Sequence, residues 1–148
     1  MRELDEILKL RRDIENIDER LWEVRQMTQP KAQTISDMPR GGERKNAIEE
    51  YIVKSEELRS KRKKIQKRLD KKWRYIEFIC AESEITEVQL TMLKLRFYYG
   101  NPWKRCVTEM QKLYTDTTWN EQKLFRKYRK ILYKIDRRKS KNIVKNVH

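Results

Sequence analysis

The stretch ILKLRRDIENIDERLWEV, residues 7–24, repeats apolar residues at alternating steps of three and four. Its seam consists of Ile7, Leu10, Ile14, Ile17, Leu21 and Val24. These steps place the side chains on one stripe of an α-helix, as in a coiled coil. Leu8 and Trp22 flank the seam, and we expect them to widen the buried stripe. Because Pro30 cannot continue a helix and disfavours it one residue earlier, the helix is predicted to end near Thr28.

A second stripe of the same kind runs through residues 44–80 and predicts one long helix. Its positions are Ile48, Tyr51 or Ile52, Ser55, Leu58, Arg62, Ile65, Leu69, Trp73 or Lys72, Ile76 and Ile79. Between the two helices, residues 28–43 hold two of the three prolines and two of the three glycines, which predicts an irregular linker. Two seams joined by a loop favour an antiparallel helical hairpin over residues 1–80, and a parallel dimer through the same seams is the alternative.

Composition agrees with an all-α protein built of long helices. Of the 148 residues, 41% are charged and 37% are apolar, and there are only three glycines and three prolines. Cys80 and Cys106 lie in apolar helical patterns, so we expect buried, reduced thiols in a cytoplasmic protein. Trp73 and Trp103 also lie on apolar faces and are expected in the core. No secretory segment or membrane-spanning stretch is visible, so a membrane partner is not expected.

The last part of the chain, residues 81–138, carries three shorter helical patterns. The first covers about residues 87–99. Thr86 and Gln89 have the spacing of a capping box, in which each side chain bonds to the backbone N–H of the other residue. Gly100 stops this helix, because glycine readily adopts the left-handed conformation found beyond helix ends.

Two further helices are predicted after this turn. One covers about residues 102–113, with a proline in its first turn. The other covers 119–137 and follows a second capping pattern, Thr118 with Glu121. Its apolar face consists of Leu124, Phe125, Tyr128, Ile131, Leu132 and Ile135. The remaining residues, 139–148, are predicted to form a basic tail that frays.

Positive charge is concentrated in the last third of the chain. The net charge is +14, and residues 100–148 alone hold 14 Lys and Arg against four Asp and Glu. A polyanionic partner is the simple explanation, and a basic face that only keeps the protein in solution is the alternative. The same alternatives apply to the run KRKK at 61–64, where a solvated face is favoured over a second phosphate-contacting stripe.

The order of supporting helix, short helix, turn and basic helix is that of a C-terminal helix-turn-helix domain, which predicts binding to double-stranded DNA. Near the start of the basic helix, Gln122, Lys123 and Arg126 are candidates for reading bases, since arginine pairs with guanine and glutamine with adenine. Candidates for phosphate contacts are Lys104, Arg105, Lys127, Arg129, Lys130, Lys134 and Arg137. Trp119 is predicted either to staple the helix start or to stack on a sugar or base.

No residue pattern supports enzyme catalysis, a metal site or a cofactor. The only histidine is His148, so catalysis or metal binding through histidine has no basis. Neither a Cys-x-x-Cys pair nor a glycine-rich phosphate loop occurs in the sequence. We therefore expect a non-enzymatic protein with no catalytic residues.

The stretch LKLRFYYGNPWKRCVTEM, residues 93–110, resembles the fourth, C-terminal region of bacterial sigma factors. The matching positions are Leu95-Arg96-Phe97, Gly100, Trp103 and Cys106-Val107. The order of segments is similar to that of small sigma-like regulators of Gram-positive phages, of the RinA and ArpU type. In those proteins a coiled region, a linker, a long helix and this helix-turn-helix follow one another. Met38-Pro39-Arg40-Gly41-Gly42 stands in the linker position, and the likeness covers most of residues 20–135.

This resemblance implies a phage or prophage transcription activator of late or packaging genes that binds promoter DNA in the bacterial cytoplasm. RNA polymerase is a further candidate partner, and a homodimer through the helical hairpin is a further expectation. The turn at 111–121 is longer than in the sigma pattern, and Val107 occupies an alanine-like position. A phage DNA-packaging component similar to a small terminase subunit is one alternative. A coiled-coil interaction module with an incidental basic tail is the other.

Overall fold

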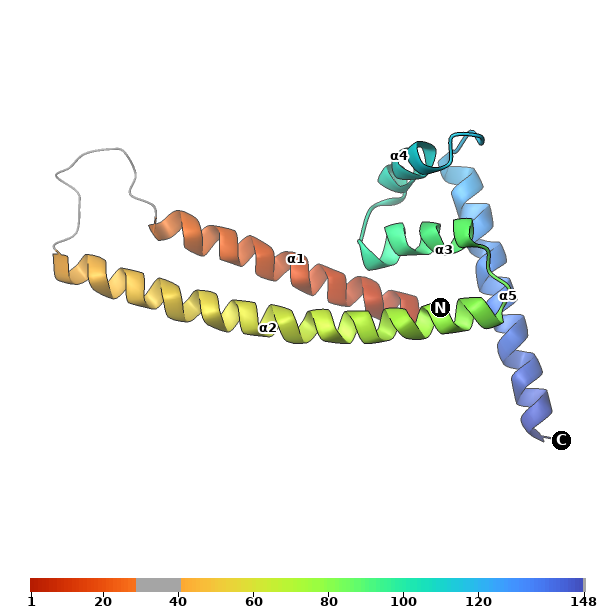
Figure 1. Ribbon diagram of the computed structural model, residues 1–148, viewed down its shortest axis with the longest axis horizontal. Coiled ribbons are helices and arrows are strands. Elements are labelled where there is room, and N and C mark those ends of the chain that lie inside the picture. Colours follow the sequence, from red (N-terminus) through yellow and green to blue (C-terminus); the bar gives the residue numbers. More distant parts are fainter. Residues whose placement is uncertain (29–40, 148) are drawn as a thin grey trace. The chain divides into compact units, whose positions relative to one another are not determined.

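The computed structural model describes residues 1–28 and 41–147, with side chains described for 1–27 and 47–141. Its elements are α1 (Arg2–Thr28), α2 (Gly41–Glu82), α3 (Glu87–Leu93), η2 (Lys94–Tyr98), α4 (Trp103–Leu113) and α5 (Glu121–Val147), shown in Figure 1. The segment η2 is a π-helical turn that continues α3. Over the part of the chain that the structure describes, the protein is therefore all-α, as the composition predicts.

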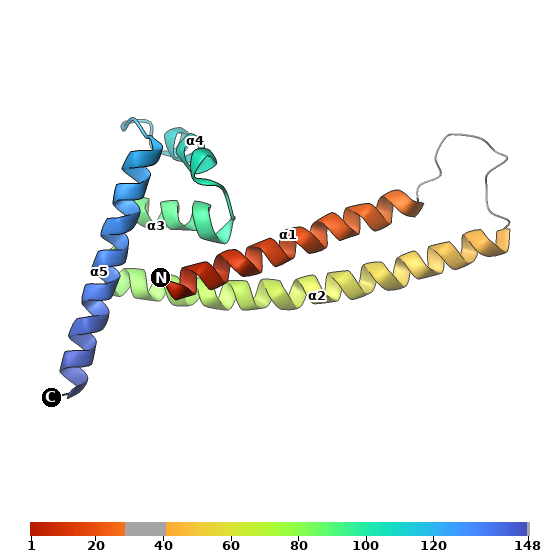
Figure 2. The ribbon, with the colours of Figure 1, turned by 180° about the vertical axis from the view of Figure 1, so that it is seen from behind.

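Helices α1 and α2 pack against each other as a long antiparallel hairpin (Figures 1 and 2). Two ion pairs between α1 and α2 show that the helices run in opposite directions. Glu6 Oε2 lies 2.6 Å from Lys72 Nζ, and Asp18 Oδ1 lies 2.6 Å from Arg62 Nε. Residue numbers thus rise along α1 as they fall along α2. Because these side chains are partly exposed, the buried seam contributes more to stability than the ion pairs.

The chain divides into two compact units. Unit 1 comprises Met1–Arg11 and Arg68–His148, and unit 2 comprises Arg12–Lys67. Unit 1 combines the first turns of α1 and the last turns of α2 with the C-terminal helices. Its buried side chains include Leu4, Ile7, Leu69, Trp73, Ile76, Met92, Leu93, Phe97, Cys106, Met110, Leu124, Ile131 and Ile135. Most of the described hydrophobic core therefore belongs to unit 1.

Unit 2 is built from the middle and far end of the two long helices and has a narrow core. Ile14 and Ile17 of the predicted seam are buried, and so is Ser55, a small polar residue farther along the hairpin on α2. The prediction that Trp22 widens the buried stripe of α1 is wrong, because 62% of this residue is exposed. A two-helix hairpin covers only one stripe of each helix, so a side chain beside the seam stays in contact with solvent.

Local sequence signals set the turns around α3. The capping box is confirmed: Gln89 N donates to Thr86 Oγ1 (3.2 Å), and Thr86 N donates to Gln89 Oε1 (3.0 Å). Gly100 has the positive φ of 71° expected beyond a helix end. Arg96 supports this turn, since its guanidinium donates to the carbonyl oxygen of Asn101 over 3.0 Å. The arginine and glycine of the sequence motif thus meet in one tight turn.

The two cysteines and two of the tryptophans pack inside unit 1. Cys80 and Cys106 are buried free thiols, as predicted. Burial raises the pKa of each thiol to about 11, so both stay protonated at neutral pH and act as small apolar side chains. Trp73 is buried, and Trp103 is half-buried within a cluster of aromatic rings.

Three predicted boundaries differ from the structure. Helix α2 begins at Gly41, before the predicted residue 44. The end of α1 at Thr28, by contrast, is as predicted. Residues 139–147, predicted as a fraying basic tail, are helical, because α5 continues to Val147 and no glycine or proline follows Pro102 to break it. Helix α5 begins at Glu121, later than predicted.

Asn120, and not Thr118, caps the start of α5. Its Oδ1 accepts a hydrogen bond from the backbone N–H of Lys123 at 2.8 Å, the geometry expected for an N-cap residue. The motif residues Met38-Pro39-Arg40 lie outside the described part of the chain. Among the helices that the structure describes, none has the length and apolar character needed to cross a membrane.

Replacing Gly100 tests the turn between η2 and α4. Gly100→Val is expected to lower the free energy of unfolding by about 1–2 kcal/mol, because a β-branched residue resists positive φ. Glu84 also has a positive φ, of 59°. Glu84→Gly should therefore change stability in the opposite direction, by up to about 1 kcal/mol. Urea unfolding of both variants is the measurement, and a stable Gly100→Val protein would contradict the assignment.

Candidate nucleic-acid interface

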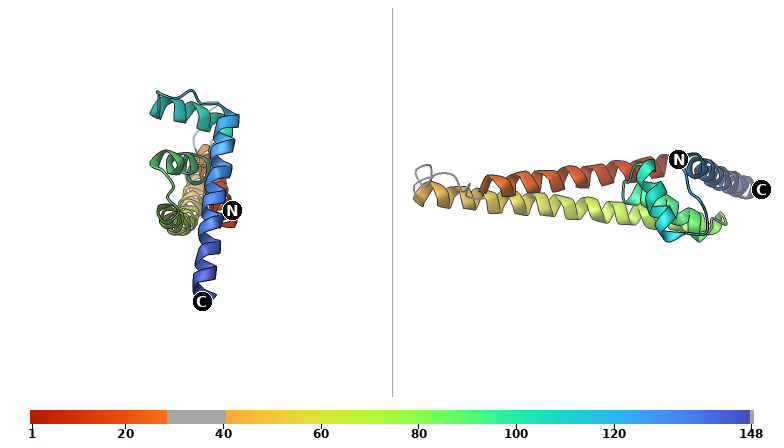
Figure 3. Two further views of the ribbon diagram at one scale, coloured as in Figure 1. Left: turned by 90° about the vertical axis from the view of Figure 1, so that its right-hand side faces the viewer. Right: turned by 90° about the horizontal axis from the view of Figure 1, so that it is seen from above.

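The apolar stripe of α5 fixes which side of this helix faces outward. Leu124, Ile131 and Ile135 are buried, and Tyr128 is half-buried. Both α3 and α4 contact α5, and the left view of Figure 3 shows them beside it. The predicted stripe is thus confirmed except at Phe125, which is 45% exposed. Phe125 lies about 100° around the helix from the preceding residue, at the border of the packed side.

The opposite side of α5 is strongly basic. Its exposed residues include Gln122, Arg126, Arg129, Lys130, Tyr133 and Arg137. Steps of three and four residues place them along one face of the helix. Four of these six side chains carry a positive charge and none carries a negative one. The face offers hydrogen-bond donors over about four helical turns.

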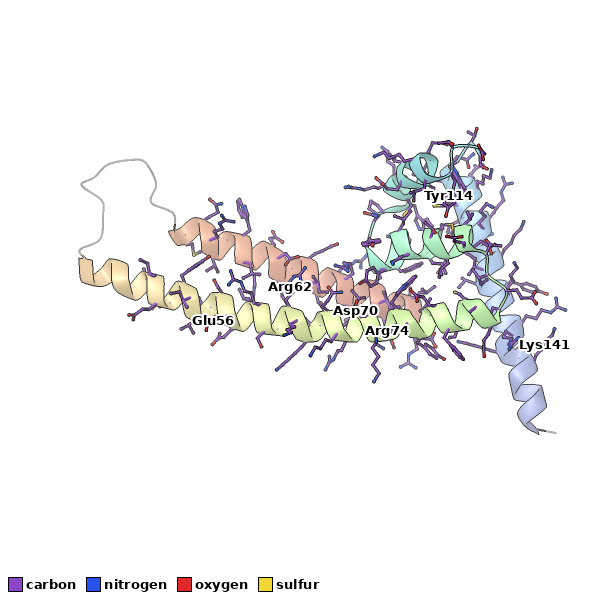
Figure 4. The ribbon with its side chains drawn as sticks, viewed as in Figure 1. Glu56, Arg62, Asp70, Arg74, Tyr114 and Lys141 are labelled. Carbon is purple, nitrogen blue, oxygen red and sulfur yellow. The ribbon has the colours of Figure 1, made fainter. Side chains whose placement is uncertain are left out.

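A network of hydrogen bonds fixes the segment before α5. Gln111 bridges it, because its Nε2 donates to Thr117 O and its Oε1 accepts from Trp119 N, each over 3.0 Å. Trp119 Nε1 donates to Tyr114 O, also over 3.0 Å, and Figure 4 labels Tyr114 where α4 ends. Only 6% of Trp119 is exposed. Trp119 therefore staples the helix start, and its buried ring has no face free for a base.

Lys123 and Lys127 lie over this tryptophan. Their Nζ atoms are 5.3 Å and 5.4 Å from the centre of the Trp119 ring, in cation–π geometry. Lys123 Nζ also donates to Thr118 O over 3.4 Å. Both lysines are half-buried. Of the three base-reading candidates, Gln122 and Arg126 are thus the two exposed ones, and Lys123 is engaged with the turn.

Of the seven phosphate candidates, Arg129 and Lys130 are exposed on the basic face and Lys127 lies over Trp119. The other four fall into two groups. Lys104 and Arg105 are exposed in the first turn of α4. Lys134 and Arg137 line a hollow of about 300 Å³ farther along α5, together with Arg138, Lys141 and the acidic residues Glu82 and Glu84. The carboxylates lower the positive potential of this second group. The structure brings Lys134 and Arg137 together, whereas Lys104 and Arg105 come from a different helix.

An aromatic cluster joins the starts of α4 and α5. The ring centre of Trp103 lies 5.4 Å from that of Tyr128 and 6.3 Å from that of Phe125. The Arg96 guanidinium lies 5.3 Å from the Trp103 ring. A shallow hollow of about 470 Å³ opens beside this cluster, lined by Trp103, Glu121, Gln122, Phe125 and Arg126. Sequence reasoning missed the hollow, although Phe125 at the edge of the predicted stripe was a signal.

The second basic run lies on α2 in unit 2. Arg62, labelled in Figure 4, pairs with Asp18 of α1. Lys61, Lys63 and Lys64 are exposed. This arrangement agrees with a solvated helix face that holds the hairpin by one ion pair. In the described ranges, no group of three or more His, Cys, Asp or Glu side chains is arranged to hold a metal ion.

No protein family model matches this chain, and neither a curated protein nor a solved structure shows significant similarity to it. The fold and the basic face of α5 are thus the observations that bear on function.

Removing the Gln111 bridge tests how the start of α5 is held. Gln111→Ala leaves Trp119 N–H and the Thr117 carbonyl without their partner, which is expected to cost about 1–3 kcal/mol of unfolding free energy. Lys112→Ala, one residue away and exposed, is the control and should change stability by less than about 0.5 kcal/mol. Urea denaturation compares the two, and equal effects would show that the bridge contributes nothing.

Proposed function

We propose that the protein is a DNA-binding transcriptional regulator in which α4, the turn after it and α5 act as a helix-turn-helix. The observation that carries the proposal is the basic outer face of α5, positioned by the burial of its opposite side. An α-helix fits the DNA major groove, and a face rich in arginine and lysine suits both base edges and phosphates.

The distribution of side chains along α5 supports a division of roles. Gln122 and Arg126 are exposed within the first two turns and have the chemistry to read adenine and guanine. Lys130 and Arg137 follow on the same face, where phosphate contacts are expected. Lys104 and Arg105 at the start of α4 are further phosphate candidates, because the first helix of a helix-turn-helix crosses the DNA backbone.

The resemblance of residues 93–110 to sigma factors motivates the more specific part of the proposal. Arg96, Gly100 and Trp103 belong to that motif, and they lie together around the turn before α4. On this basis we propose promoter DNA as the target and activation of phage or prophage genes as the role. RNA polymerase is the proposed protein partner.

The experiment is selection of binding sites from random DNA, followed by competition titrations with two variants. Arg126→Ala should cost about 1–3 kcal/mol on the selected site and relax its base preference at one or two positions. Lys134→Ala should weaken binding to selected and random DNA about equally, since a phosphate contact carries no sequence information. Arg74→Ala, an exposed position on α2, is the control and should leave binding unchanged.

Two outcomes would contradict the proposal, and a third would contradict only the assignment of the base-reading face. If the protein binds neither selected nor random DNA, the basic face has another purpose. If it binds all sequences equally, it is not a sequence-specific regulator, and a packaging role becomes the better explanation. Equal loss of selected and random binding in Arg126→Ala would show that the base-reading face has been assigned wrongly.

A further inference from the structure

We propose that Phe125, supported by Trp103, is a specificity-determining residue that contacts the 5-methyl group of a thymine in the major groove. This inference rests on the proposed DNA-binding function and adds a base contact to it. The hollow of about 470 Å³ between the starts of α4 and α5 would receive the methyl group. Apolar side chains are the ones that recognise this group.

Phe125 combines exposure with a fixed orientation. Its ring is 45% exposed, yet it is held by rings centred 6.3 Å away in Trp103 and 6.4 Å away in Tyr128. The Arg129 guanidinium lies 4.8 Å from the ring centre and covers part of it. An exposed aromatic side chain held by several neighbours loses little conformational entropy on binding, which favours a role in recognition.

The neighbours of Phe125 indicate which part of DNA would meet it. Gln122 precedes it by three residues and Arg126 follows it, and both line the same hollow. Glu121 also lines the hollow, and its carboxylate repels phosphate groups. A base edge therefore fits this place better than the sugar-phosphate backbone. Gln122 and Arg126 are suited to adenine and guanine, and the apolar surface beside them is suited to the thymine methyl, the apolar group that the major groove presents.

Substitution of deoxyuridine for thymine tests the inference, because it removes only the methyl group. Each thymine of the site selected from random DNA is replaced singly, and the dissociation constant of the wild-type protein is measured. We expect about a fourfold loss of affinity at one or two positions, which corresponds to roughly 0.8 kcal/mol for a buried group of this size. In Phe125→Ala, thymine and uracil at those positions should bind equally.

Phe78→Ala is the matched control, since Phe78 is an exposed phenylalanine on α2 outside the proposed interface. This variant should keep the wild-type preference for thymine. Circular dichroism compares the helical content of both variants with that of the wild-type protein. The deoxyuridine measurement on the wild-type protein stands even if a variant fails to fold. A protein that prefers its selected site but is indifferent to every deoxyuridine substitution would overturn the inference and leave the proposed function standing. Absence of DNA binding would overturn both.

Discussion

The burial of one apolar stripe on α5 is the constraint on which the rest of the C-terminal structure depends. Leu124, Ile131 and Ile135 are buried within unit 1, where α3 and α4 contact the helix. Fully burying side chains of this size contributes about 1.5–3 kcal/mol each, far more than the exposed charges can contribute. Because the residues opposite a buried stripe of a helix point away from the core, this packing directs the arginines and lysines on that side of α5 toward solvent. The basic face is thus a consequence of the core as well as of composition.

The segment between α4 and α5 determines where α5 begins. Gln111 and Trp119 satisfy backbone groups that would otherwise be left without partners, and Asn120 caps the first turn. Hydrogen bonds from Gln111 and Trp119 connect this turn to the end of α4. The proposed reading of bases by α5 requires an accurately positioned helix, and these contacts position its N-terminal end.

Periodicity and local capping signals together predicted much of the architecture. Steps of three and four residues located the long helices, and the Thr86–Gln89 capping box and Gly100 located the ends of the shorter ones. Trp22 and Phe125 were misjudged, because a helical wheel gives direction around an axis but not the extent of the neighbouring helices. One of the two roles predicted for Trp119, stapling the helix start, agrees with the structure, but the residue was assigned to α5 itself and lies before the cap at Asn120. The aromatic hollow depends on Trp103 and Phe125 meeting across two helices, which spacing within one helix does not reveal.

The central claim is that the outer face of α5 binds DNA, and lysine footprinting tests it most directly. The protein is acetylated briefly with and without its selected DNA site, and the modified lysines are identified by mass spectrometry. Lys130 on α5 and Lys104 on α4 should become protected, because phosphate contacts would cover their exposed ammonium groups. Lys61 and Lys63 on α2 should react equally in both samples. Protection confined to α2, with Lys130 unchanged, would contradict the account.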